Sequence, residues 1–400
     1  MDLVADAAHL SDGLIDLRRR LHAVPEVGLQ LPVTQQVLLA ELAGLDLEIT
    51  TGRDLTSIVA VLRGGSAGPL VLLRGDMDAL PVVERSGEPF APQHGSAHAE
   101  AMHACGHDLH MAGLVGAARL LSAHRAELAG DVVFMFQPGE EGFNGAGRMI
   151  DEGVLTAAGR KADAAYGLHV FSSWFPNRTF AARPGTLMAA SAGLEVKVVG
   201  AGTHGSSPHR GKDPIPVACE IVTALQTLVT RQFDIFDPVV ITVGSFHAGT
   251  KRNIVPDDAV FDATVRSFSP EAARAVADKS VRLCEAIAAA HGLTAEVKFV
   301  GEYPVTVNDD AEYEFVADSV RELFGSDRFT PMDEPLSGSE DFSRVLEEVP
   351  GAYLFLGATK AHEFETAPSN HSPLAAFDDS VLPDAATLLA ELAVRRLARG

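Results

Sequence analysis

Short, continuous apolar runs constrain the fold of this chain most strongly. Residues 70–73 lie between Gly68-Pro69 and Gly75-Asp76, residues 132–136 stop at Pro138, and residues 164–168 form a weaker third run. Each run has the length of a strand buried on both faces, and helical segments separate the runs along the chain. Strands that alternate with helices predict an α/β layer sandwich with a largely parallel sheet.

Segments 14–21, 34–42 and 109–121 have the apolar spacing of helices, and Ser11 is expected to be the N-cap of the first. The same α/β pattern returns late in the chain, with a strand at 353–357 and a helix at 382–396. Polar residues follow the apolar runs directly. In open α/β sheets, ligands bind at the carboxyl ends of the strands.

The pattern changes near Gly185. The order becomes β-α-β-β-α-β: strand 194–198, helix 214–231, strands 239–246 and 259–268, helix 270–290 and strand 295–300. This order is typical of a ferredoxin-like α+β unit. We therefore expect a catalytic α/β domain at 1–185 and 302–400, with an inserted ferredoxin-like lid domain at 186–301.

Composition excludes several classes of protein. At 400 residues the chain is long enough for two domains, and 32 basic against 54 acidic residues give a net charge of −22. Such a charge argues against binding to nucleic acid or to an anionic membrane. Three scattered cysteines do not form a disulfide framework, and no apolar run is long enough to span a bilayer. The acidic N-terminus does not resemble a signal peptide, so we expect a cytoplasmic protein.

Cys105-Gly106-His107 lies just ahead of an Ala/Gly-rich helical segment. A thiol near a helix N-terminus favours the thiolate, and thiolate with imidazole suits zinc and its first-row neighbours. Taken alone, a buried cysteine beside unrelated surface histidines explains this motif equally well. His169, at the end of the third apolar run, and His371, in an Asn-His-Ser-Pro turn, are further candidates for metal binding.

Glu140 and Glu141 follow the second apolar run. Adjacent side chains on a loop point in different directions, so one can bind a metal while the other acts as a general base. Asp78, beyond the first run, can orient a metal-binding histidine through its second ring nitrogen. Each acid is also compatible with an ordinary solvated loop.

Seven motifs in a fixed order cover nearly the whole chain, and the chain resembles the metal-dependent amidohydrolases related to aminoacylase and carboxypeptidase. The nearest branch is that of the hippurate hydrolases, N-acyl-amino-acid amidohydrolases and auxin-conjugate hydrolases. The motifs are Arg20-Leu21-His22 with Pro25-Glu26, Arg74 to Pro81, Met102 to Asp108, Gln137-Pro138-Gly139-Glu140-Glu141, Gly167-Leu168-His169, Gly338 to Phe342 and Asn370-His371-Ser372-Pro373.

The resemblance implies two divalent metal ions, for which Zn, Mn, Co and Ni are the candidates. The implied ligands are Cys105 (bridging), His107, Glu141, His169 and His371. In the same way it implies that Glu140 is the base and that Asp78 supports the metal ligands. The expected reaction is hydrolysis of the amide bond of an N-acyl or N-aroyl amino acid.

The resemblance also gives the inserted domain a role as lid and dimerisation domain, so we expect a homodimer. His204 corresponds to the histidine that reaches the active site of the neighbouring subunit. Asn253, Arg266 and Gly338 are implied in substrate binding, the first two at its carboxylate. Two rival hypotheses remain: a dipeptidase or aminopeptidase of the same superfamily, and a binding protein on the same fold that has lost catalysis.

Overall fold

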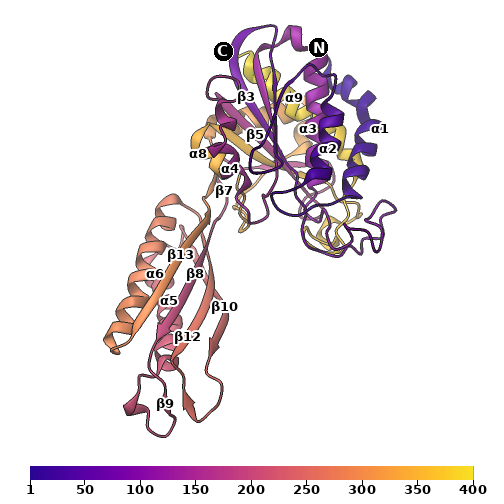
Figure 1. Ribbon diagram of the computed structural model, residues 1–400. Coiled ribbons are helices and arrows are strands. Elements are labelled where there is room, and N and C mark those ends of the chain that lie inside the picture. Colours follow the sequence, from indigo (N-terminus) through magenta and orange to yellow (C-terminus); the bar gives the residue numbers. More distant parts are fainter. Residues whose placement is uncertain (400) are drawn as a thin grey trace. The chain divides into compact units, whose positions relative to one another are not determined.

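The computed structural model describes residues 1–399, which divide into two compact units (Figure 1). The first unit consists of Met1–Leu187, Val307–Glu334 and the chain from Asp341 onward. The second consists of Met188–Thr306 and Pro335–Glu340. The second unit is thus inserted between two parts of the first. The short segment Pro335–Glu340, which no sequence pattern indicated, also packs with it.

A mixed eight-stranded sheet is the centre of the first unit. Its four central strands, β4, β3, β5 and β16, are parallel, whereas β1, β2 and the β16–β6 pair are antiparallel. The expected parallel sheet is therefore interrupted by these antiparallel pairs, while the edge pair β6–β15 is again parallel. In sheet order the strands are β1 (Glu48–Thr51), β2 (Ile58–Leu62), β4 (Ala129–Gln137), β3 (Ser66–Asp76), β5 (Ala164–Phe171), β16 (Gly351–Gly357), β6 (Phe180–Ala182) and β15 (Phe329–Pro331).

Helices α1, α3 and α9 pack together, and α3 and α9 contact the central strand β3. Small residues allow α3 and α9 to approach closely: a Cβ on Gly116 would lie 2.6 Å from Ala386 Cβ. The side chains of residues 70–73 are fully buried, as expected for a strand covered on both faces. The helices of this unit are α1 (Leu3–His22), α2 (Pro32–Leu42), α3 (His107–Ala123), α4 (Gly145–Asp151), α7 (Asp310–Phe324), α8 (Ser343–Glu348) and α9 (Leu382–Leu397).

The expectation that Ser11 caps the first helix is wrong. Helix α1 begins at Leu3, and the carboxylate of Asp2 accepts a hydrogen bond from the Ala5 N–H. Ser11 lies in the middle of the helix. The buried residues Leu3 and Ala7 extend the apolar face toward the N-terminus by about three turns ahead of Leu14, where the expected helix began.

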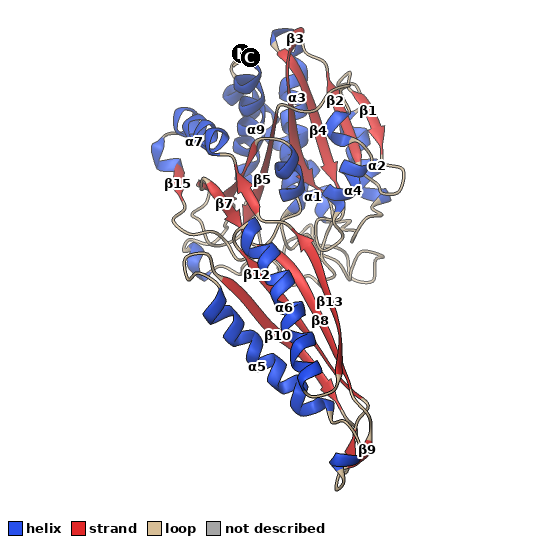
Figure 2. Cartoon of the chain, turned by 90° about the vertical axis from the view of Figure 1, so that its left-hand side faces the viewer, coloured by secondary structure: helices blue, strands red, loops and turns tan. Residues whose placement is uncertain are grey.

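The second unit is a four-stranded antiparallel sheet with α5 and α6 on one face (Figure 2). Its strand order β10-β12-β8-β13 is that of a split β-α-β unit, in which β12 lies between β8 and β10. The elements are β8 (Ala190–Val199), β9 (Thr203–His204), α5 (Pro214–Gln232), β10 (Val239–Ala248), β11 (Ile254–Val255), β12 (Asp258–Ser267), α6 (Pro270–Ala290) and β13 (Thr294–Tyr303). Strands β7 (Gly185–Met188) and β14 (Thr306–Asn308) pair where the chain passes between the units.

Candidate metal centre

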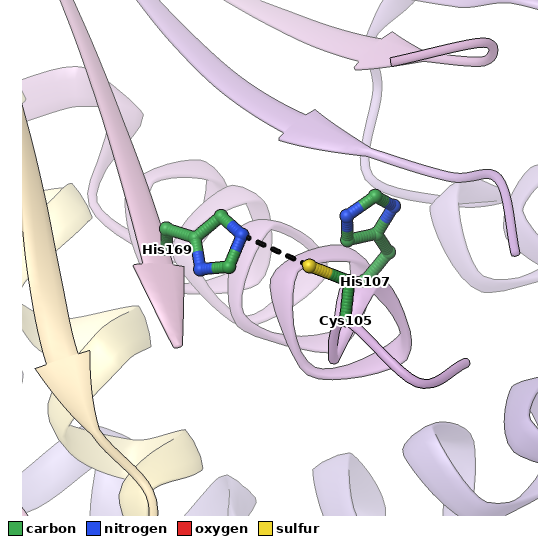
Figure 3. Close-up of side chains that lie close together, drawn as sticks. All are labelled: Cys105, His107 and His169. Carbon is green, nitrogen blue, oxygen red and sulfur yellow. Dashed lines mark hydrogen bonds between the residues drawn. The ribbon is translucent and has the colours of Figure 1, made fainter. Parts of the chain in front are cut away.

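Three donors meet where α3 begins and β5 ends. Cys105 lies in the turn before α3, His107 is the first residue of that helix, and His169 lies near the end of β5 (Figure 3). Gly106, between the first two, has a φ of 80°, which turns the chain so that its neighbours can face one site. Cys105 Sγ lies 3.3 Å from His169 Nε2. The candidate ligand atoms of these three residues all lie within 4.8 Å of one another.

Two further donors reach the same sulfur from other segments. His371 Nε2 lies 3.3 Å from Cys105 Sγ and 3.2 Å from Glu141 Oε1. His371 has a positive φ of 69°, uncommon for a non-glycine residue, and its N–H donates to the Ala104 carbonyl. The five expected ligands therefore form two overlapping groups, each of which contains Cys105.

The donors suit a divalent transition metal. Both ring nitrogens of His107 are buried and lack a hydrogen-bond partner among residues 1–399. Buried polar atoms are rarely left without a partner, so an unpaired imidazole beside a thiol and carboxylates indicates a ligand that the protein atoms do not supply. Sulfur, nitrogen and oxygen donors in one cluster are typical of zinc and related ions.

Asp78 holds the Glu140-Glu141 loop beside this cluster. Its two carboxylate oxygens accept the backbone N–H groups of Glu140 at 3.0 Å and of Glu141 at 3.1 Å. Asp78 Oδ1 also lies 3.6 Å from His107 Nδ1. Glu140 is buried, and its carboxylate belongs to a group with His107 and Glu141. One side chain thus fixes both glutamates and faces one imidazole.

Asp76 and His110 form a second support, and it is their pairing that the sequence motifs did not identify. The Val170 N–H donates to His110 Nε2 at 2.8 Å, so His110 Nδ1 carries the proton and donates to Asp76 Oδ1 at 2.5 Å. The other oxygen of Asp76 accepts from Arg74 and lies 3.6 Å from His107 Nε2. The available signal was the spacing of His107 and His110, which places both on one helix face.

Two of the proposed ligands, His107 and His371, lie where positive charge is favoured, whereas burial and the neighbouring His110 lower the pKa of His169 well below its usual range. Burial lowers the pKa of His107, but Asp76, Asp78 and Cys105 together raise that pKa well above its usual range. Hydrogen bonds to Cys105 and Glu141 raise the pKa of His371 to about 10. A site that stabilises protons this strongly also stabilises a divalent cation in their place.

His204 and Asn253 lie together in the second unit. The pair β9–β11 joins His204 to Ile254, and the Gly205 N–H donates to the Asn253 carbonyl at 2.9 Å. Both residues line a cavity of about 860 Å³ with His247 and Asp257. The Ser206 N–H donates to His204 Nδ1 at 3.1 Å, which leaves Nε2 as the N–H donor of a neutral ring.

Arg266 and Gly338 lie elsewhere in the second unit. Arg266 Nη1 donates to Thr264 Oγ1 at 2.9 Å, and within residues 1–399 Arg266 forms no ion pair. Gly338 belongs to the segment Pro335–Glu340, where a Cβ would lie 3.3 Å from Met188 Cε. Asn253 was expected to assist Arg266. Asp258, which lines the cavity, and Arg266 are eight residues apart on β12, which corresponds to roughly 26 Å along the strand.

Comparisons with known proteins were made on sequence and on structure. Residues 72–395 match the family described as Peptidase family M20/M25/M40. Thermostable carboxypeptidase 2 of Saccharolobus solfataricus is 38% identical over 403 residues, which is 99% of this chain and 99% of that protein. N-acetylcysteine deacetylase of Bacillus subtilis is 35% identical over 382 residues, 95% of this chain and 96% of that one.

Among solved structures, the YXEP protein of Bacillus subtilis is described as a dinuclear metal-binding peptidase of the M20 family. It superposes with a TM-score of 0.82 at 32% identity, covering 98% of this chain and 99% of that one. Fold, donor cluster and similarity together define a metal-dependent hydrolase that acts on amide bonds. The chain belongs to peptidase family M20/M25/M40, so the family resemblance noted in the sequence is confirmed.

Within residues 1–399, no helix combines the length and apolar character needed to cross a membrane.

Proposed function

We propose that this protein hydrolyses the amide bond of N-acyl amino acids at a dinuclear metal site, releasing a carboxylic acid and a free amino acid. The observation that carries the proposal is the meeting of five donors, from four separate stretches of the first unit, in two groups that share Cys105. The similarity to N-acetylcysteine deacetylase supports the substrate class, and the similarity to the dinuclear YXEP protein supports the number of ions.

Cys105, His107, Glu141, His169 and His371 would hold the two ions. Cys105 is the natural bridge because it belongs to both donor groups. When bound, the metals polarise the substrate carbonyl and lower the pKa of a water molecule toward about 7. The mixed donors fit Zn, Mn, Co or Ni, and the residues do not distinguish among them.

Glu140 would act as the general base. It would take a proton from the attacking water and pass that proton to the nitrogen of the leaving amine. Its position is supported by Asp78, which accepts hydrogen bonds from the backbone of both Glu140 and Glu141. Asp78 would therefore position the base and one ligand loop with a single carboxylate.

His204 would donate a hydrogen bond to the oxyanion of the tetrahedral intermediate. Its Nδ1 already accepts the Ser206 N–H, so its Nε2 is a donor without any need for a positive charge. Arg266 would bind the carboxylate of the amino acid, a group for which a guanidinium offers two parallel hydrogen bonds. At Gly338, the absence of a side chain would allow the backbone to lie close to the substrate.

A homodimer formed through the second unit would reconcile these roles. Within one chain, β12 extends roughly 26 Å from Asp258, which lines the cavity of Asn253 and His204, to Arg266, so the cavity and Arg266 lie toward opposite ends of that strand. Residues of the two groups can meet on one substrate when they come from two copies. The strands β10 and β13 at the edges of the second sheet offer backbone groups for such pairing. We expect this dimer to be cytoplasmic.

The test compares wild-type protein with Glu140→Gln, using Glu347→Gln, an exposed acid on α8, as the matched control. The proposal expects Glu140→Gln to lose turnover of N-acetyl amino acids while metal content, measured by elemental analysis, stays at the wild-type level. The control should retain both. Persistent turnover in Glu140→Gln would overturn the role of the base.

A second candidate is peptide hydrolysis, favoured by the similarity to a carboxypeptidase. In both reactions the amino acid that is released carries a free carboxylate. Arg266 can therefore bind the substrate of either reaction. Dipeptides with a free α-amino group, assayed beside their N-acetyl derivatives, separate the two. Faster cleavage of the unmodified dipeptides would replace the N-acyl proposal with a peptidase.

A further inference from the structure

The only tryptophan of the chain, Trp174, has an unusual backbone. Its φ is 72°, and the Phe175 N–H donates across it to the Ser173 carbonyl at 2.9 Å. This is a γ-turn of the strained, positive-φ type, rare for a bulky residue. The side chain remains 51% exposed. Strain of this kind persists only where the surrounding structure imposes it, and it often occurs at ligand-binding positions.

Trp174 continues a stack of rings that begins at the candidate metal centre. Residues 169 and 171 alternate along β5, so both side chains lie on one face of the strand. The rings of His169 and Phe171 have centroids 5.0 Å apart, and those of Phe171 and Trp174 are stacked at 5.5 Å. An aromatic wall therefore extends from His169, a proposed metal ligand, to solvent.

Hydrogen bonds fix this wall to the segment that carries His371. The Ser172 N–H donates to Asn370 Oδ1 at 2.9 Å, and the single proton of the Ser172 hydroxyl faces the Pro368 carbonyl at 2.8 Å and Asn370 Oδ1 at 3.0 Å. The Ala358 N–H donates to the Phe171 carbonyl at 2.7 Å. The loop that carries Trp174 is thus held to the neighbours of two proposed ligands, His169 and His371.

A role in covering the hydrophobic core does not explain the position of the Trp174 side chain. Phe171 already packs edge-on against Phe175 and Phe355, and it is itself half-buried. A large ring that served only to bury apolar surface would itself be largely buried. Trp174 instead leaves half of its surface open beside the site.

We propose that Phe171 and Trp174 form the acyl-group subsite, which selects flat, apolar acyl groups such as aroyl groups over acetyl. This inference rests on the proposed function. The scissile carbonyl must lie at the metal centre, so its acyl substituent lies against the adjoining wall of the first unit. The amino-acid carboxylate is assigned to Arg266 in the second unit and does not compete for that wall.

The kinetic test uses N-benzoylglycine and N-acetylglycine with wild-type protein, Trp174→Ala and Trp174→Phe. Aromatic stacking predicts a loss on the order of 10-fold in kcat/KM for the benzoyl substrate in Trp174→Ala, with little change for the acetyl substrate. Trp174→Phe, which restores a ring, should recover most of the loss. Phe236→Ala, which removes an exposed ring from the second unit, is the control and should change neither rate.

A binding measurement keeps the inference separate from the proposed function. Because Trp174 is the only tryptophan, its fluorescence reports directly on this subsite. Benzoate should alter the emission of the metal-loaded protein, and acetate should not. If wild type cleaves neither substrate, the proposed function is wrong. The fluorescence response to benzoate then tests by itself whether Trp174 belongs to a binding site for aromatic acyl groups. An unchanged benzoyl-to-acetyl ratio in Trp174→Ala, a shift in amino-acid selectivity instead, or no response to benzoate would overturn it.

Discussion

Cys105 contrasts with the other two cysteines of the chain. Its sulfur lies 3.3 Å from a nitrogen of both His169 and His371, whereas Cys219 is exposed and Cys284 is buried within the second unit. Burial raises the pKa of the Cys284 thiol to about 12, so this thiol stays protonated at neutral pH. The three thiols of the chain therefore lie in three different environments.

This contrast predicts how metal removal changes alkylation by iodoacetamide. With metal bound, only Cys219 should react within minutes. After chelation, Cys105 should react as well, because its thiolate is no longer coordinated. Cys284 should stay unmodified in both states until the protein is unfolded. Peptide mass spectrometry measures each site, and equal labelling of Cys105 with and without metal would contradict its role as a ligand.

Some residues of the candidate metal centre could be identified from the sequence, and others could not. Cys105, Glu141 and His371 lie in recognisable motifs, and their roles as ligands remain predictions that the geometry supports. Asp76 and His110 were missed as a pair because their contact depends on how β3 lies beside α3. Trp174 carried no motif at all. Its significance lies in a backbone angle, which composition does not reveal.

At the scale of elements, the start of α3 is held by a buried ionic network from α1. Asp108 Oδ2 lies 2.7 Å from both Arg18 Nε and His22 Nδ1, and His22 Nε2 lies 3.0 Å from Glu84. A ring that donates through both nitrogens is protonated. Strong apolar periodicity predicted both helices from sequence. The network that joins them could not be predicted, because nothing local to either helix specifies its partner.

This network predicts a pH dependence of stability. Burial lowers the pKa of His22, but Asp108 and Glu84 raise it more, so the folded pKa lies above the unfolded value of about 6.5. The stabilisation is then fully present below the unfolded pKa and is lost as pH rises through the folded pKa. Urea unfolding of wild type and His22→Gln, measured from pH 6 upward, should give free energies of unfolding whose difference shrinks as the pH rises. Parallel curves would contradict the charged state of His22.

Gly106 offers a matched pair of substitutions at the same helix start. Its φ of 80° resembles the 81° of Gly87, but a Cβ on Gly106 would lie 2.4 Å from Val170 Cγ2, whereas Gly87 faces open space. Gly87→Ala should lower the free energy of unfolding by about 1–2 kcal/mol, because only the left-handed backbone conformation opposes the added methyl group. Gly106→Ala should cost more and should also reduce metal content, because it moves Cys105 and His107. Equal losses in thermal unfolding would show that the site tolerates the added methyl group.

At the scale of the whole molecule, the proposed site residues are distributed over the two units of the chain. The metal centre belongs entirely to the first unit, while His204, Asn253 and Arg266 belong to the second. Removal of an oxyanion donor such as the one proposed at His204 typically costs about 3–4 kcal/mol in activation free energy.

Mixed dimers test whether His204 acts across two copies. Glu140→Ala and His204→Ala proteins should each be nearly inactive alone. After subunit exchange, half of the dimers contain one subunit of each variant. In each of these hybrids one of the two sites has both Glu140 and His204. About a quarter of wild-type activity should therefore return. Hybrid formation is confirmed by native mass spectrometry on differently tagged subunits. Hybrids without activity would place His204 in the site of its own chain.

The sulfur of Cys105 and the imidazole of His371 are 266 residues apart in the chain. A ribosome that adds 5–20 residues per second needs roughly 13–53 s to synthesise the intervening stretch. During that interval the nascent chain carries Cys105 without one of its partners, while the whole second unit is made. If His371 is a ligand as proposed, the centre can be completed only after residue 371 has been synthesised, and a premature stop before that residue removes one of the five proposed donors.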